Sequence, residues 1–231
     1  MGLNLCGQLV HELGKKIISG EIATDSCIPS EEELRSKYDV SRTVTREAIR
    51  ALIAKGLVES KPKKGTSVCP TEKWNFLDID VLNWSVVTDQ SGGFFQHLHQ
   101  LRSAIEPEAA SIVAKNGPQE LLDFVVEQAN KMESLADSPE EYSKADLDFH
   151  KAILMGAKNP LFNPIINVIH FAQSYTLKMT NNKQEDNLES IPIHKAIANS
   201  IAARQVDLSK ASMIAHFDHL ATRLDKYGVL N

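Results

Sequence analysis

Hydrophobic positions in the first forty residues recur at helical spacing, and polar signals mark where the predicted helices begin and end. Residues 5–19 place leucines and isoleucines on one side of a helix, which the sequence SGE then ends. Ser30 precedes EEELRSKY as a natural N-cap, and Glu33 stands three residues later, at the position of a capping box. We therefore predict helices over residues 5–19 and 31–38.

A third predicted helix follows the short break YDV, is capped by Ser41 and covers residues 42–55. Its apolar stripe, which can pack on the first two helices, consists of Val44, Ala48, Ile49 and Leu52. The polar side chains off this stripe, most of them near the N-terminal end, are Arg42, Thr43, Thr45, Arg46 and Arg50. Two short helices joined by a few residues form a helix-turn-helix pattern, in which the start of the second helix contacts base edges.

A basic hairpin is predicted directly after these helices. Beyond Gly56, the segments LVES and TSV indicate two short strands on either side of the turn KPKKG. Such a hairpin is typical of a wing, whose tip can reach the DNA backbone or the minor groove. The pattern therefore predicts a winged helix-turn-helix domain over residues 1–70.

The rest of the chain shows helical periodicity without strand-like alternation. Breaks at QSGG, NGP, DSP, KNP and NNKQEDN separate helical patterns at residues 94–115, 118–136, 139–156, 160–180, 187–203 and 206–226. Residues 71–92 are predicted to be a linker that enters a connecting helix near Asp78. The predicted fold is mainly α, with the winged helix-turn-helix joined to an all-α bundle of six to seven helices over residues 93–231.

Composition and charge distinguish the two predicted parts of the chain. The 231 residues are 42% hydrophobic and 24% charged, which is a soluble globular composition, and no apolar run is long enough to predict a transmembrane helix. The cysteines Cys6, Cys27 and Cys69 form no CxxC pair, and the N-terminus lacks the order of a secretory signal, so we expect a reducing cytoplasm. Residues 1–73 have a balance of +2 and residues 74–231 of −7, which indicates a basic module attached to an acidic one.

The basic charge is most concentrated in residues 42–64. Seven lysines and arginines face only Glu47 and Glu59 there, a local balance of +5. An ordinary solvated helix face would account for some of these cations. A capped helix pair followed by a basic, glycine-tipped hairpin in this order favours double-stranded operator DNA as the partner.

Residues 8–69 resemble the DNA-binding domain of GntR-type bacterial regulators, through PSEEEL, VSRTVTREAI and the KKGTSV wing. The resemblance implies DNA contacts from Ser41, Arg42, Thr43 and Arg46, and from Lys64 and Gly65 at the wing tip; Thr45 is added from its place off the apolar stripe. Several relatives carry Arg where Glu32 stands here, so a contact from the second helix is not expected with the same chemistry.

Polar groups with ligand chemistry fall on the predicted apolar faces of the bundle. Arg102 belongs to the stripe of LHQLRSAIEPEAA, and a buried guanidinium requires an anion. Asp146 and His150 are four residues apart and share one face, while His194 and His216 lie on the apolar faces of two later helices. A carboxylate and three imidazoles suit a divalent ion such as zinc, nickel or manganese. Each histidine alone is more often a hydrogen-bonded core residue, and the four groups could also be a polar core network.

Residues 93–224 resemble the FCD effector domain of the FadR branch of GntR regulators, through LRSAIEPEAA, ADLDFHKAIL, HKAIANSI and AHF. The resemblance implies that Asp146, His150, His194 and His216 hold a divalent metal, zinc before nickel or manganese, and that Arg102 faces the effector cavity. The segment WNFLDIDVLNW also looks like that of regulators of galactonate-type catabolism, which indicates a sugar-acid effector.

These features together predict a metabolite-responsive bacterial transcriptional regulator. We expect a homodimer on operator DNA, repression relieved by a small carboxylate, no membrane partner, no enzymatic activity, and a cytoplasmic location, nucleoid-associated when bound to DNA. One alternative is a metal-free, FadR-like regulator with a larger acyl ligand. Another is a metal-dependent hydrolase, although no general base or nucleophile motif accompanies the four candidate ligands.

Overall fold

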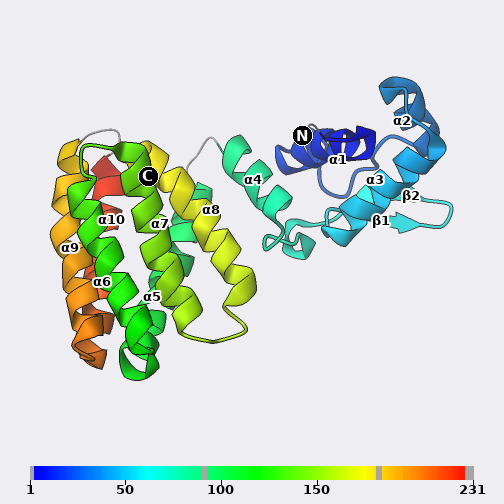
Figure 1. Cartoon of the computed structure of the whole chain (residues 1–231). Coiled ribbons are helices and arrows are strands. Elements are labelled where there is room, and N and C mark those ends of the chain that lie inside the picture. The colour runs from blue at the N-terminus through cyan, green and yellow to red at the C-terminus, as the bar shows by residue number, and fades with distance from the viewer. Residues whose placement is uncertain (1–2, 90–92, 181–183, 227–231) are drawn as a thin grey trace. The chain divides into compact units, whose positions relative to one another are not determined.

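The structure is a computed structural model, and it describes residues 3–89, 93–180 and 184–226. The chain divides into two compact units, Met1–Gln90 and Ser91–Asn231, which are coloured blue to cyan and green to red in Figure 1. Each unit has its own hydrophobic core. We therefore describe the units separately.

Three helices of the first unit form where the sequence signals predict them: α1 (Leu5–Ile18), α2 (Glu31–Tyr38) and α3 (Arg42–Ala54). The capping box of α2 is complete, because the Ser30 N–H donates to the Glu33 carboxylate at 2.7 Å and the Glu33 N–H donates to the Ser30 hydroxyl at 3.3 Å. The core between the helices contains Leu9, Leu13, Ile17, Leu34, Ala48, Leu52 and Leu57. Both α1 and α2 pack on α3.

A two-stranded antiparallel sheet follows α3. Strands β1 (Val58–Lys61) and β2 (Gly65–Val68) pair in the register Val58 with Val68 and Lys61 with Gly65. The tight turn between them places Lys63 at φ 63° and Gly65 at φ 84°. Both angles are positive, and Gly65 adopts this conformation without steric cost because glycine has no Cβ. The winged helix-turn-helix prediction is confirmed.

Helix α4 (Ile79–Thr88) comes after a short 3₁₀ turn, η1 (Thr71–Lys73), and packs on α1. Its Trp84 is 3% exposed and lies so close to Gly14 that a Cβ at that position would be 2.2 Å from the indole ring. The Trp84 indole N–H donates to His11 Nδ1 at 3.0 Å. The connecting helix is thus part of the first unit, and Gly14 makes room for it.

The second unit is built from six helices in the part of the chain that the structure describes: α5 (Gly93–Asn116), α6 (Gln119–Ser134), α7 (Pro139–Gly156), α8 (Asn163–Thr180), α9 (Gln184–Ala202) and α10 (Val206–Lys226). The helix α5 packs on α7, α9 and α10, and α6 packs on α7 and α9. These helices agree with the six predicted patterns to within a few residues at each end, so the all-α bundle is confirmed.

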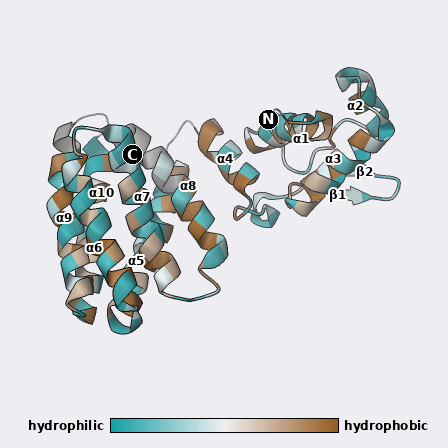
Figure 2. Ribbon diagram, viewed as in Figure 1, coloured by the Kyte–Doolittle hydropathy of each residue, from teal (hydrophilic) through white to brown (hydrophobic). Residues whose placement is uncertain are grey.

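Figure 2 shows both hydrophobic (brown) and hydrophilic (teal) residues on the bundle helices. The apolar faces meet in one core, whose fully buried side chains include Val113, Leu122, Val125, Phe149, Ile153, Ile197, Ile201 and Met213. Among the described residues, none of the helices combines the length and apolar character needed to cross a membrane.

Candidate metal centre and candidate nucleic-acid interface

The N-terminal end of α3 presents an exposed polar surface. Ser41 is the N-cap, and its hydroxyl accepts from the Val44 N–H at 3.2 Å, which fixes where the helix begins. Ser41, Arg42, Thr43 and Arg46 are all exposed. The carboxylate of Glu31, at the start of α2, lies 3.9 Å from Arg42 Nε and 4.0 Å from Arg46 Nε. Both guanidinium groups are therefore available to an outside anion and share one weak internal partner.

Thr45 is the one predicted contact that the structure contradicts. Its side chain is 0% exposed, and its hydroxyl donates to the Ser41 carbonyl at 3.2 Å. The residue lies on the inner face of α3, together with the buried Ala48, Ile49 and Leu52. Thr45 stabilises the start of the helix and cannot reach a base in this arrangement.

The cations of residues 42–64 divide into two groups. Lys55 binds the carboxylates of Asp78 and Asp80, each at 2.7 Å, and so ties α3 to the start of α4. Glu47 pairs with Arg50 at 2.7 Å, and Glu59 pairs with Lys61 at 2.5 Å. The exposed cations without such short contacts are Arg42 and Arg46 on α3 and Lys63 and Lys64 on the wing.

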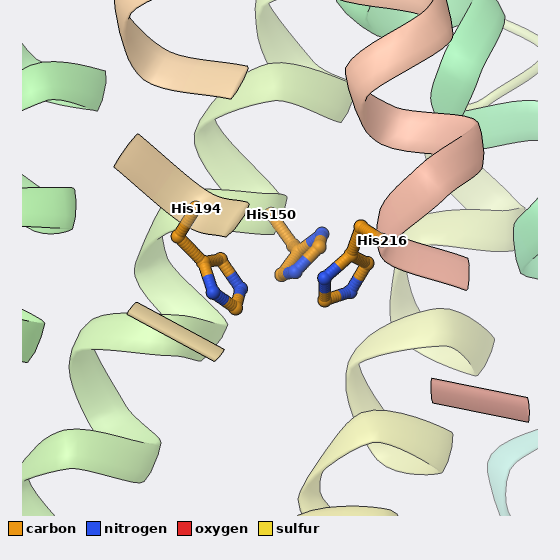
Figure 3. A group of neighbouring side chains, drawn as sticks. All are labelled: His150, His194 and His216. Carbon is orange, nitrogen blue, oxygen red and sulfur yellow. The ribbon is translucent and has the colours of Figure 1, made fainter. Parts of the chain in front are cut away.

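Three histidines gather inside the bundle. His150 on α7, His194 on α9 and His216 on α10 are 1%, 1% and 7% exposed, and one ring nitrogen of each lies within 4.8 Å of those of the other two. Figure 3 shows the three rings close together between their helices. Their ring centroids are 4.7–5.5 Å apart. Residues from three helices, 66 positions apart in the chain, thus meet at one point.

Asp146 joins this cluster from one turn earlier on α7. Its Oδ1 lies 2.9 Å from His194 Nε2 and 3.9 Å from His150 Nε2. Despite the short distance, His194 Nε2 has no hydrogen-bond partner among the described residues. Asp146 Oδ1 therefore approaches it without the angle of a hydrogen bond. Two acceptor atoms that approach without pointing at each other can both point at a third position, as ligands of one ion do.

Two of the histidines have a tautomer that their neighbours set. His150 Nδ1 donates to the Glu106 carboxylate, and His194 Nδ1 donates to the Ser190 carbonyl at 2.9 Å. The Nε2 lone pairs of both rings are thereby left facing the cluster, and both Nε2 atoms are buried without a hydrogen-bond partner. His216 Nδ1 is likewise buried without a hydrogen-bond partner. Burial, and then the neighbouring His194 and His150, lower the pKa of His216 well below its usual value, so this ring is neutral.

Arg102 is buried in α5, as predicted, and its anion is Glu106. The Nε–H of Arg102, a residue only 4% exposed, donates to Glu106 Oε1 at 2.6 Å, one helical turn away. The guanidinium lies 5.1 Å from the Phe217 ring centroid, and its Nη2 has no hydrogen-bond partner in the described part of the chain. Burial alone would raise the pKa of Glu106, but Arg102 and His150 together hold it below its usual range.

Glu106, Ser190 and Tyr142 are the site residues that sequence reasoning missed. The Tyr142 and Ser190 hydroxyl groups form a hydrogen bond at 2.5 Å, and Ser190 also supplies the carbonyl that holds His194. The spacing of Arg102 and Glu106, four residues apart on one helix, was a signal for Glu106. The backbone carbonyl of Ser190 left no signal in the sequence.

The other histidines lie outside the cluster. His97 and His170 are exposed. His99 is half-buried, with its ring 5.7 Å from that of Phe217, and His219 is also half-buried. The two histidines of the HxH pair, His97 and His99, therefore lie in different environments.

The residues present fit a divalent metal. Nitrogens bound to one ion at about 2.1 Å can be at most about 4.2 Å apart, so the three rings need only small side-chain movements. The donors are three neutral imidazoles and one carboxylate, which first-row divalent metals accept. The buried nitrogens without partners are otherwise costly to maintain.

Each of the two units matches a known protein family. Residues 5–68 match the gntR family of bacterial regulatory proteins, and residues 97–219, more than half of the chain, match the FCD domain. The chain belongs to the GntR family. Its first unit is the family's DNA-binding domain, and its second unit is an FCD domain.

Named relatives of this GntR-family protein are transcriptional regulators. It is 29% identical over 225 residues to the galactonate operon transcriptional repressor of Escherichia coli K12, which covers 97% of this chain and 98% of the relative. It is 25% identical over 209 residues to the repressor NanR of Klebsiella aerogenes, covering 89% and 80%. A solved GntR structure from Streptococcus agalactiae shares the fold, with a TM-score of 0.54, 21% identity and coverage of 95% and 99%.

Proposed function

We propose that this GntR-family transcriptional regulator is a dimeric repressor whose operator binding is relieved by a small carboxylate, such as a sugar acid, at a metal site in the FCD domain. The observation that carries the proposal is the meeting of three buried imidazoles, each with a ring nitrogen that has no hydrogen-bond partner. Asp146 Oδ1 lies beside two of them, 2.9 Å from His194 Nε2 and 3.9 Å from His150 Nε2. Asp146, His150, His194 and His216 would hold the ion. Zinc suits this donor set first, with nickel or manganese as alternatives.

The surroundings of the metal centre suit an anionic ligand. Arg102 keeps an unpartnered Nη2 in a buried position, and burial and the nearby Arg102 lower the pKa of His99. A bound metal supplies Lewis-acid attraction for carboxylate oxygens. Arg102 adds a charged donor, and a guanidinium orients a carboxylate better than a point charge does.

A sugar acid is preferred among small carboxylates because of the relatives. The relative from Escherichia coli K12 is named for the galactonate operon, and the alignment covers almost the full length of both chains. Galactonate is therefore the first ligand to test. An effector can change operator binding only if it binds two arrangements of the protein with different affinity.

The DNA-binding half of the proposal rests on the exposed face of α3 and the wing. Ser41, Arg42, Thr43 and Arg46 form one surface, and Lys64 and Gly65 lie at the tip of the hairpin. We assign base contacts to the arginines and phosphate contacts to the wing. A homodimer would place two such surfaces on a near-palindromic operator.

The test combines metal content with ligand-dependent stability. The purified protein is analysed for metals and is then melted with and without galactonate, other sugar acids, and simple di- and tricarboxylates. About one divalent ion per chain, and a rise in melting temperature with one acid class that a chelator removes, is the expected result. A protein without metal whose melting temperature rises only with acyl-CoA would favour a metal-free, FadR-like regulator. Turnover of an ester or amide by a metal-loaded protein that fails to bind DNA would favour a hydrolase.

A further inference from the structure

Among the described residues of the FCD domain, Glu106 is the most deeply buried charged group that the proposed function has not used. It is 0% exposed, and its two carboxylate oxygens have different partners. One oxygen accepts from Arg102 Nε at 2.6 Å, and the other accepts from His150 Nδ1. A single carboxylate therefore lies between a proposed metal ligand and the proposed anion-binding arginine.

We propose that Glu106 is a positioning residue that turns His150 Nε2 toward the metal and holds Arg102 by its Nε edge, so that one carboxylate sets both groups. The proposal rests on the proposed function, because it concerns how the same site is arranged. Glu106 touches neither the metal nor the effector in this arrangement. It acts through the two residues that do.

The geometry explains why a carboxylate is needed at this position. Glu106 receives two N–H donors, one from a guanidinium and one from an imidazole. A carboxylate offers two acceptor oxygens, whereas an amide of the same shape offers one acceptor and one donor. Glutamine could satisfy only one of the two partners, and its NH₂ group would face an N–H of the other.

The consequence for His150 is a defined tautomer. With Nδ1–H held by Glu106, the lone pair of His150 lies on Nε2, which is the nitrogen that has no hydrogen-bond partner. A carboxylate behind a ligating imidazole also increases the electron density at the ligating nitrogen. His194 has only a backbone carbonyl behind it, from Ser190. Glu106 thus makes His150 the more strongly donating of the two.

The consequence for Arg102 is a fixed orientation. Its Nε is occupied by Glu106, its plane lies beside Phe217, and Nη2 is left without a partner. The arginine cannot turn its Nε edge toward a ligand while Glu106 is in place. Arg102 in turn holds Glu106 against His150, so a change at Arg102 should reach the metal.

The test measures metal affinity in four full-length proteins: wild type, Glu106→Gln, Arg102→Met, and the double variant. Zn²⁺ affinity is measured by competition with a chromophoric chelator, and Co²⁺-loaded protein is measured by its visible d–d absorption. Glu106→Gln should lower Zn²⁺ affinity by about 10- to 100-fold and shift the Co²⁺ bands, because outer partners of ligating histidines have effects of that size. Glu108→Gln is the matched control, since Glu108 is on the same helix but pairs at the surface with Lys210.

The wild type, the two single variants and the double variant also form a double-mutant cycle. Arg102→Met should weaken Zn²⁺ binding less than Glu106→Gln does, and the two effects should not add, because both act through one carboxylate. Strictly additive effects would overturn the link between Arg102 and His150. If Glu106→Gln alone leaves a buried cation unpaired and fails to fold, the comparison of Arg102→Met with the double variant still isolates the effect of Glu106 on His150.

The outcomes separate this proposal from the proposed function. If wild type binds Zn²⁺ and Glu106→Gln binds it equally tightly with the same Co²⁺ spectrum, Glu106 has no positioning role and the metal site stands. If wild type binds neither ion, the metal site itself is wrong, and the role of Glu106 is refuted with it.

Discussion

The two units of this GntR-family regulator keep their polar chemistry in opposite places. In the first unit, the candidate DNA contacts are exposed, and Arg42 and Arg46 are held only by one carboxylate at about 4 Å. In the second unit, the candidate ligands Asp146, His150, His194 and His216 are all at most 7% exposed. The candidate contacts of the first unit can therefore meet a large polyanion at the surface, while the candidate ligands of the second face the interior of the bundle.

The difference also separates two energetic regimes. Exposed ion pairs contribute about 0–1 kcal/mol, so the arginines of α3 lose little when they exchange Glu31 for a phosphate or a base. Buried polar groups are costly unless they are satisfied, so the unpartnered nitrogens of the histidine cluster favour the binding of a partner. The weak contacts of the α3 arginines with Glu31 can thus be replaced by contacts with DNA. The unpartnered nitrogens of the histidine cluster instead favour tight binding of an ion.

The largest effect should come from the interior. His194→Ala removes one of the four candidate ligands, and we expect Zn²⁺ affinity to fall by at least about 100-fold, since loss of even an outer partner costs about 10- to 100-fold. The response to the effector should be lost, while operator binding without effector is retained. Metal analysis and a gel-shift titration would measure both.

His170→Ala is the control for this change, because His170 is an exposed histidine of the same unit. It should leave metal content and effector response as in wild type. Retention of one metal per chain by the His194→Ala variant would remove His194 from the ligand set.

At the surface, Arg46→Ala should weaken operator binding by about 1–3 kcal/mol if the guanidinium reads a base. The expected loss is greater for the operator than for unrelated DNA, because a base contact carries sequence information and a phosphate contact does not. Fluorescence anisotropy with both DNA sequences at one salt concentration would measure the ratio. Arg50→Ala should have a smaller effect, because Arg50 is paired with Glu47 at 2.7 Å. Equal losses on both DNA sequences would make Arg46 a phosphate contact.

Gly14→Ala tests how the first unit holds its last helix. A Cβ at position 14 would lie 2.2 Å from the Trp84 ring, so the indole must move, and overpacking of this kind costs about 1–3 kcal/mol. The gain of helix propensity from glycine to alanine offsets about 0.5–1 kcal/mol of that cost. We expect a net loss of unfolding free energy and a change in tryptophan fluorescence, measured by urea denaturation.

Gly7→Ala is the matched control in the same helix. Its new Cβ would meet the Leu3 side chain at 3.2 Å and 3.4 Å and Asn4 Oδ1 at 3.3 Å, and no aromatic ring. The same gain of helix propensity applies here, so stability should equal that of wild type or exceed it by up to about 1 kcal/mol. A Gly14→Ala variant with unchanged stability and fluorescence would mean that Trp84 does not depend on the space above Gly14.

The sequence predicted the first unit more completely than the second because its signals are local. Ser30, Glu33 and Ser41 mark the ends of α2 and α3, and the glycine-containing turn marks the wing, so neighbouring residues alone fix the structure. The failure at Thr45 could have been avoided with the same local signals. At about 100° per residue, a helical wheel places Thr45 between Leu52 and Ile49, inside the apolar stripe, and its burial agrees with that position.

In the bundle, helical spacing indicated which residues point inward, but it could not show that they converge. Asp146 and His150 are linked by one helical turn, whereas His194 and His216 reach them only through the packing of α7, α9 and α10. The resemblance to FCD domains supplied that step in advance. The second partner of Glu106, His150, could not be read from any local pattern, because this contact joins distant segments of the chain, α5 and α7. The Ser190 carbonyl lies only four residues before His194 on the same helix, but every residue has a backbone carbonyl, so the residue type gave no signal.

The smallest effect should come from Glu31→Gln, which changes the weak contact between α2 and the arginines of α3. Because Glu31 lies 3.9 Å from Arg42 and 4.0 Å from Arg46, its carboxylate competes with DNA for both guanidinium groups. Its loss should tighten binding to the operator and to unrelated DNA alike, by about 0.2–1 kcal/mol at low salt, and the gain should fade as salt screens the charges. Glu32→Gln is the control, since it removes the same charge from the exposed neighbour of Glu31. Equal gains from both variants would show a general loss of repulsion, without a specific role for the contact with Arg42 and Arg46. A weaker operator affinity with unchanged binding to unrelated DNA would instead mean that Glu31 holds the arginines in the orientation that reads bases. Neighbouring side chains would then fix the orientation of the candidate binding groups in both units.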